Sequence, residues 1–235
     1  MRKIITINLL FLLATTNILA QNNVEKNTKN KTKKELKLIA KQEIEKMHNG
    51  VLLIRLKTKT NSISALRKSG KDKLADKIEA KQAAYNLSII SAFKTEFNFC
   101  PTYFFFSDQS NLILEGKLDQ VQFLNDSLQY DPKIEYNNQP YLTAEFGLIE
   151  QDPGTQTDDY YYVEGKDGIE KRTKYNGATN MTFDALIIKN NQFIQQRKPF
   201  PYYVRTLNSL PFKRKPKTVV KRMNTQLHAF YSKVN

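Results

Sequence analysis

The sequence predicts an α/β or α+β fold: a mixed β-sheet built on a β–α–β core, with later β-hairpins and a C-terminal helix. Two apolar runs, near residues 51–58 and 102–107, have the length and composition of buried strands. The residues between them show helical periodicity, and two strands joined by a helical crossover usually lie parallel. Turn signals in the second half of the chain favour hairpins there.

The crossover is predicted to contain two helices. Ser62 is a candidate N-cap for the first, which should end at Gly70 because glycine readily adopts the left-handed conformation at helix C-termini. The second is expected to start at Asp72. Its apolar residues recur at intervals of three to four, as an amphipathic helix requires: Leu74, Ile78, Ala83, Tyr85, Ile89, Ala92, Phe93 and Phe97.

The start of the chain, residues 1–20, has the pattern of a secretory signal peptide. Arg2 and Lys3 precede a short apolar core, and Ala20 supplies a small residue before the expected cleavage point. We therefore expect an extracytoplasmic protein, either periplasmic or secreted. The apolar core is too short to span a membrane comfortably, and no later stretch predicts a transmembrane segment after signal cleavage.

The mature chain is predicted to be one globular α/β domain over residues 32–235. Residues 21–31, which are polar and rich in asparagine, should form a disordered lead. A helix over 32–47 should open the domain, with a capping box between Thr32 and Glu35.

The second half of the chain carries the remaining strand signals. Asn111–Leu118 is a strand candidate interrupted at Gly116, and Tyr141–Ile149 is another. Further strands are predicted as hairpins around 165–168 and 190–191, as a short strand over 202–205, and a helix should close the chain over 218–234.

The chain is basic and has one cysteine. Its net charge is +14, and removal of Arg2 and Lys3 with the signal peptide lowers this to +12. Cys100 has no partner for an intramolecular disulfide, so the fold is not a disulfide-stapled scaffold. Export combined with this cysteine usage is typical of a bacterial envelope protein.

The sequence predicts no metal site and no cofactor. His48 and His228 belong to no Cys/His cluster with zinc-ligand spacing. The chain also lacks G-x-S-x-G, P-loop and G-x-G-x-x-G motifs, which argues against lipase-like hydrolysis, nucleotide-triphosphate chemistry and dinucleotide binding.

Cys100 enters the second core strand just before Pro101, and we expect a buried, small apolar side chain rather than a reactive thiol. The order strand–helix–strand, hairpin, terminal helix loosely resembles the thioredoxin family over residues 51–107 and 183–234. The resemblance lies in element order alone. The redox motif of that family has no match in this chain, so its chemistry is not implied.

A catalytic alternative centres on Asp108. It directly follows the second core strand, where open α/β sheets place their ligands. Acids that could approach it for acid–base chemistry are Glu115, Asp119, Asp158 and Asp159. No calcium-loop signature supports a metal among them, so solvated loop acids are the simpler interpretation.

The most distinctive charge feature is a C-terminal basic segment, predicted to bind anions. It contains Lys213, Arg214, Lys215, Lys217, Lys221 and Arg222, with Tyr202, Tyr203 and Phe212 nearby in sequence. Such patterns can bind nucleic acid, but export argues against that partner. The candidate partners are an anionic lipid, an acidic glycan or an acidic protein, and the alternative is a solvated patch that maintains solubility.

We therefore favour a non-enzymatic binding or accessory protein that contacts an anionic envelope component. The alternatives are an enzyme of unknown class with its site near Asp108, and a thioredoxin-like fold without redox cysteines that serves as an interaction scaffold. The sequence leaves the oligomeric state open.

Overall fold

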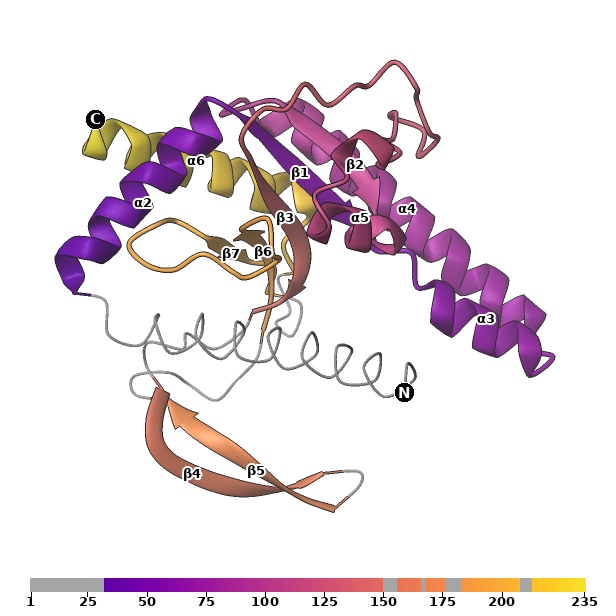
Figure 1. Cartoon of the computed structure of the whole chain (residues 1–235). Helices are drawn as coiled ribbons and strands as arrows, with labels where there is room; N and C mark the ends of the chain where they lie inside the picture. Colours follow the sequence, from indigo (N-terminus) through magenta and orange to yellow (C-terminus); the bar gives the residue numbers. More distant parts are fainter. Residues whose placement is uncertain (1–31, 150–155, 166–167, 176–182, 208–212) are drawn as a thin grey trace, which may run out of the picture. The chain divides into compact units, whose positions relative to one another are not determined.

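The computed structural model describes residues 32–149, 156–165, 168–175, 183–207 and 213–235 (Figure 1). The chain divides into two compact units, residues 37–150 with 182–235 and residues 1–36 with 151–181. The predicted signal peptide and disordered lead lie outside the described residues, and the single domain over 32–235 stays a prediction.

The first unit contains a five-stranded mixed sheet with the order β2-β1-β3-β6-β7. The strands are β1 (Val51–Leu56), β2 (Thr102–Phe106), β3 (Tyr141–Leu148), β6 (Asp184–Lys189) and β7 (Tyr203–Arg205). Strand β1 is parallel to both neighbours, β2 and β3, whereas β6 is antiparallel to β3 and β7. The predicted fold class, a mixed sheet on a β–α–β core, is confirmed.

Two helices form the crossover from β1 to β2: α3 (Thr60–Lys68) and α4 (Asp72–Glu96). Gly70 separates them with φ +71°, as predicted for a glycine stop. The prediction of Ser62 as N-cap is wrong, because α3 already begins at Thr60. The preceding residue, Lys59, has φ 58°, and this left-handed turn directs the chain from β1 into α3.

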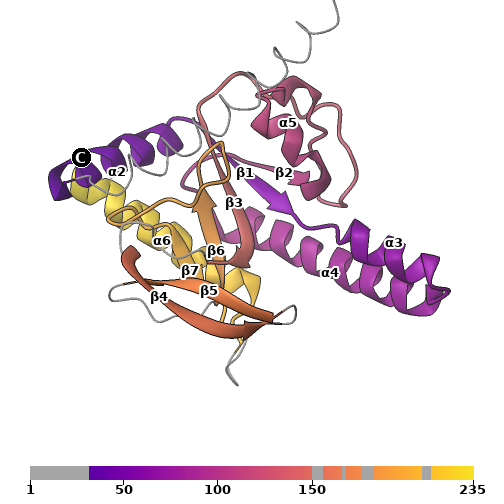
Figure 2. The same ribbon diagram turned by 60° about the horizontal axis from the view of Figure 1, so that its bottom comes forward.

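The sheet is covered on both faces beside β1 and β2. Leu52 and Ile54 point into a core shared with α2 (Lys33–His48), α4 and α6 (Pro216–Val234). Val51 and Leu53 face the other way, toward α5 (Ser110–Leu114) and the loop after it. Figures 1 and 2 show α4 and α5 on opposite sides of these strands. Burial on both faces is the reason that the first four residues of β1, Val51–Ile54, are all apolar.

The predictions for the helices at the two ends of this unit are confirmed. Thr32 and Glu35 form the capping box of α2: the Thr32 N–H donates to Glu35 Oε2 at 2.6 Å, and the Glu35 N–H donates to Thr32 Oγ1 at 3.3 Å. The terminal helix α6 packs Val219, Met223 and Leu227 into the core.

Two strand predictions are wrong. Asn111–Leu118 contains helix α5 and a turn at Gly116, whose φ is +73°. The three consecutive apolar residues 112–114 are too few to show a helical or a strand spacing, so their pattern fits a short helix as well as a strand. The second predicted hairpin is reduced to a bridge between Lys189 and Gln195, and β6 pairs with β7 instead.

The second unit contains an antiparallel ribbon of β4 (Gln156–Gly165) and β5 (Gly168–Tyr175). This confirms the predicted hairpin around 165–168. No helix in the described part of the chain has the length and apolar character needed to cross a bilayer.

Candidate functional site

Asp108 anchors the loop that follows β1. It lies exposed on the 3₁₀ turn Ser107–Gln109 after β2. Its carboxylate accepts hydrogen bonds from the hydroxyls of Thr58 at 2.7 Å and Thr60 at 2.9 Å. These contacts hold the start of α3 against the end of β2, so the geometry gives Asp108 a positioning role.

Glu115, one of the acids proposed as partners of Asp108, is engaged by a lysine. Glu115 forms an ion pair with Lys117 at 2.7 Å. Asp158 and Asp159 lie on β4, whose side chains fall outside the described structure. Among the residues that the structure describes, no three His, Cys, Asp or Glu side chains are grouped closely enough to hold a metal ion.

A cavity of about 280 Å³ lies at the carboxyl ends of β1 and β3, and we call it the β1/β3 pocket. Strand β3 contributes Phe146 and Gly147, and helix α4 contributes Gln82, Tyr85, Asn86 and Ile89. Asp184 and Ala185 line it from the start of β6, which runs antiparallel to β3 and therefore begins at this same edge. Asp108 is not among the lining residues.

The β1/β3 pocket is strongly basic. Its cationic lining residues are Arg55, Lys57, Lys59, Lys81 and Lys213. Asp184 is the one carboxylate among the lining residues. A positive field concentrated in a concavity attracts small anions.

Two buried amides form the frame of this pocket. Asn86 Nδ2 donates to the carbonyl oxygen of Lys57 at 2.9 Å, and Gln82 Nε2 donates to Asn86 Oδ1 at 3.0 Å. Asn86 is only 2% exposed. A buried amide is costly unless it is hydrogen-bonded, so these two linked hydrogen bonds fix the end of β1 against α4.

Tyr85 and Phe146 form the apolar part of the pocket. Their ring centroids are 6.1 Å apart in an edge-to-face arrangement. Burial, with a smaller effect of the Asp184 charge, raises the pKa of Tyr85 to about 12. Tyr85 therefore keeps its O–H at neutral pH and can donate a hydrogen bond.

A buried ion cluster lies next to this pocket. Glu145 Oε2 is 2.6 Å from Arg55 Nη1, and Glu145 Oε1 is 3.0 Å from Lys189 Nζ. Arg55 Nε also donates to Ser110 Oγ at 2.8 Å. Arg55 is thus committed to the structure of the sheet, which distinguishes it from the pocket lysines.

The structure divides the predicted basic segment between three environments. Lys213 lines the β1/β3 pocket. Arg214 and Arg222 line a separate groove beside β7, whereas Lys217 forms an exposed ion pair with Glu96 at 3.3 Å. The remaining two, Lys215 and Lys221, are exposed.

The groove beside β7, which we call the β7 groove, has a volume of about 780 Å³. Its cationic lining residues are Lys198, Arg205, Arg214 and Arg222, and no carboxylate of the described residues lines it. Tyr202 and Tyr203 also line it, so the predicted association of these aromatics with the basic segment is present in space. Arg205 is held over the Phe183 ring, with its Cζ 3.8 Å from the ring centroid.

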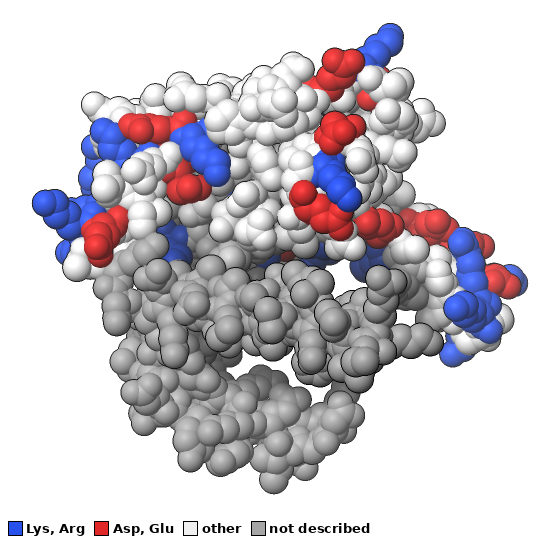
Figure 3. Space-filling model, viewed as in Figure 1, with Lys and Arg blue, Asp and Glu red and all other residues white. Residues whose placement is uncertain are grey.

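The surface beyond these sites is mixed in sign on the face shown in Figure 3. Acidic and basic side chains are interspersed over α2 and over the α3 end of the molecule. Ion pairs of this kind include Lys41 with Glu45 on α2 and Arg67 with Glu79 between α3 and α4. Such pairing of opposite charges is typical of a solvated helix face.

Cys100 is buried, and the two histidines are structural. Burial raises the pKa of the Cys100 thiol to about 12. His48 stacks on Tyr231 at 4.1 Å between ring centroids, and His228 hydrogen-bonds Asn98 at 2.9 Å. These contacts join the ends of α2 and α6 to the chain before β2.

We expect Cys100 in the folded protein to resist alkylation, because its thiol is buried and stays protonated. Iodoacetamide labelling at about pH 8, followed by mass spectrometry, should be slow for the native chain and fast in denaturant. Equal labelling rates in both states would show that the thiol is accessible in the fold.

Sequence reasoning identified Lys213 but missed the rest of the β1/β3 pocket. Gln82 and Asn86 lie four residues apart on the buried side of an amphipathic helix, and that is the signal that could have found them. The lysines after β1 lie 22 or more residues from Lys81 in sequence, so only the fold brings them together.

No family model matches the chain, and neither the curated proteins nor the solved structures contain a detectable relative of it.

Proposed function

We propose that the protein is a non-enzymatic extracytoplasmic binding or accessory protein, and that it contacts an anionic envelope component through the β7 groove. The observation that carries this proposal is the lining of the groove, in which the described residues include four cationic side chains and no carboxylate. The signal-peptide pattern of residues 1–20 supports the location, and the partner is accordingly an anionic lipid, an acidic glycan or an acidic protein.

The chemistry of the lining suits anion recognition. Three of the four cations are arginines, whose planar guanidinium groups bind carboxylates and phosphates in a bidentate manner. Tyr203 is partly exposed beside them and offers a flat surface and a hydroxyl. The volume of about 780 Å³ leaves room for several units of a polymer or for a headgroup.

The catalytic alternative has weaker support. Glu145 is a buried carboxylate with a shifted pKa, as the enzyme hypothesis requires. Burial would raise this pKa, but Lys189 and Arg55 lower it further than burial raises it. Glu145 is therefore held ionised between two cations, an environment unsuited to a general acid at neutral pH.

The test is a binding measurement with the double variant Arg214→Gln, Arg222→Gln. Anionic phospholipid vesicles, a polyuronic acid and an acidic polypeptide are offered separately at low and moderate salt. We expect one of them to bind, with affinity that falls with salt and is reduced about tenfold or more in the variant.

The matched control is Lys215→Gln, Lys221→Gln, which removes the same charge from the same segment at positions that do not line the groove. We expect a much smaller loss of affinity from it. Equal losses of affinity in both variants would show that the ligand is attracted to the basic surface in general and not bound in the groove. Failure of all three ligands at low salt would overturn the proposed function.

A further inference from the structure

The β1/β3 pocket is separate from the β7 groove, and the inference drawn from it does not depend on the function proposed for that groove. We propose that this pocket binds a compact phosphate monoester, with the phosphoryl group among the lysines and the organic part against Tyr85 and Phe146. Four observations carry this proposal: the place of the pocket in the sheet, its unpaired charge, its rigid frame and its apolar wall.

The pocket lies where the sheet changes direction. The crossover after β1 leads to β2 on one side, while β3 pairs with β1 on the other. The next strand of the sheet after β3 is β6, which lies on the side of β3 away from β1, so the edge between β1 and β3 is a topological switch point, where a crevice opens. In open α/β sheets this crevice is the usual place for ligands.

The lysines of the pocket have no counter-ion of their own. Lys57, Lys59, Lys81 and Lys213 form no ion pair with any acidic side chain in the described part of the chain. A phosphate monoester carries close to two negative charges at neutral pH and three strong acceptor oxygens. Lysine ammonium groups, each with three rotatable donors, can surround such a group from several directions.

The frame of the pocket fixes the backbone of Lys57 in the absence of a ligand. The buried amide of Asn86 holds the Lys57 carbonyl oxygen, and the amide of Gln82 in turn holds Asn86. A methyl group on Gly147 would lie 3.6 Å from Lys57 Nζ, so the ammonium lies beside bare backbone of β3. The backbone of Lys57 is therefore fixed at the rim of the pocket, while its exposed side chain can turn toward a ligand.

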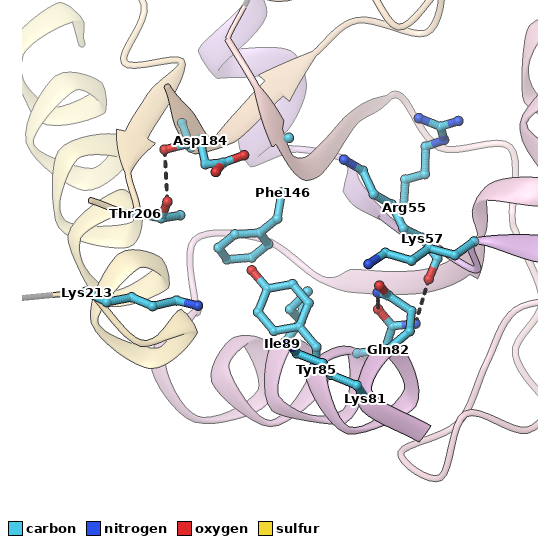
Figure 4. A pocket seen from close by; sticks show the side chains of 14 residues that line it. Arg55, Lys57, Lys81, Gln82, Tyr85, Ile89, Phe146, Asp184, Thr206 and Lys213 are labelled. Carbon is cyan, nitrogen blue, oxygen red and sulfur yellow. Dashed lines mark hydrogen bonds between the residues drawn. The ribbon is translucent and has the colours of Figure 1, made fainter. Parts of the chain in front are cut away.

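The pocket also has an apolar wall for the organic part of the ligand. Figure 4 shows Lys57 and Lys213 extending toward the pocket from opposite sides, with Tyr85 and Phe146 between them. Tyr85 lines the pocket, and its hydroxyl can donate a hydrogen bond to a ligand oxygen. A cavity of about 280 Å³ restricts the ligand to a small molecule.

Isothermal titration of the full chain with glycerol 3-phosphate tests the proposal, with glycerol, inorganic phosphate and succinate as comparisons. We expect the ester to bind most tightly and glycerol not to bind. Lys57→Gln and Lys81→Gln should each weaken binding of the ester about tenfold. Tyr85→Phe should weaken binding of the ester while leaving that of inorganic phosphate unchanged, because it removes only the hydroxyl.

The control is Lys77→Gln, which removes a lysine one turn away on the same exposed stretch of α4 but outside the pocket. It should leave binding unchanged. Absence of ester binding, or an equal loss in Lys77→Gln and Lys81→Gln, would overturn the site. Succinate or inorganic phosphate binding as tightly as the ester would overturn the assignment to a phosphate monoester.

Discussion

Replacement of Glu145 by Gln is expected to lower the free energy of unfolding by about 3–5 kcal/mol. The Glu145 side chain is 9% exposed and lies between Arg55 and Lys189, at 2.6 and 3.0 Å. Glutamine keeps the shape but removes the negative charge that lies between Arg55 and the 8% exposed Lys189 side chain. Equilibrium unfolding in urea, followed by circular dichroism, measures the loss.

Glu79→Gln is the matched control for this substitution. Glu79 Oε2 lies 2.6 Å from Arg67 Nη2, the same distance as in the Arg55–Glu145 pair, but both side chains of the Arg67–Glu79 pair are about half exposed. Solvent screening makes such a pair worth little, so we expect a change within about 0.5 kcal/mol. Similar losses in the free energy of unfolding in the two variants would show that burial does not make the Glu145 ion pairs more stabilising than an exposed pair.

The same carboxylate predicts the response of the fold to acid. Burial alone would raise the pKa of Glu145, but Lys189 and Arg55 together place this pKa below its ordinary value. A lowered folded-state pKa means that the stabilisation is complete above the unfolded-state pKa of about 4.3 and is lost as pH falls through the folded-state pKa. The stability difference between the wild type and Glu145→Gln should therefore shrink below about pH 4, where urea midpoints can be compared.

The β–α–β core could be predicted because its signals are local. The apolar runs at β1 and β2 each have the composition and length of a strand. In α4 the helical spacing of apolar residues continues over many turns, and Gly70 marks the break between the two crossover helices. The stretch around α5 was not predictable in the same way. Its three apolar residues are too few to show a period, and the packing of Ile113 against β1 and β2 decides their conformation.

The candidate sites depended on contacts that the sequence does not record. The basic segment was visible as a charge run, but its division between two concave surfaces follows from where α6 begins beside β7. Lys57, Lys81 and Lys213 come from three distant segments, and each alone resembles an ordinary surface lysine. Asp108 was noticed for its place after β2, yet its two threonine contacts give it a positioning role that its position in sequence does not indicate.

Replacement of Gly50 by Ala is expected to destabilise the fold by about 3 kcal/mol or more. A Cβ atom at this position would lie 1.9 Å from the carbonyl oxygen of Pro140 and 2.8 Å from that of Lys46. Both obstacles are backbone atoms, so no change of side-chain rotamer can relieve the clash. In the sequence Gly50 is recognisable only as a turn residue before β1. In the fold it allows Pro140, 90 residues later, to approach the backbone at the start of β1.

The obstructing carbonyl cannot move away freely, because Pro140 O accepts the Val51 N–H at 2.9 Å where β1 and β3 begin to pair. Movement of Pro140 would therefore break the parallel pairing on which the β1/β3 pocket depends. Gly70→Ala is the control: this glycine has φ +71° and no atom within 4 Å of the added methyl, so it should cost only about 1 kcal/mol, from backbone strain alone. Urea midpoints that fall equally in both variants would mean that backbone conformation, and not the close approach of Pro140, makes Gly50 necessary.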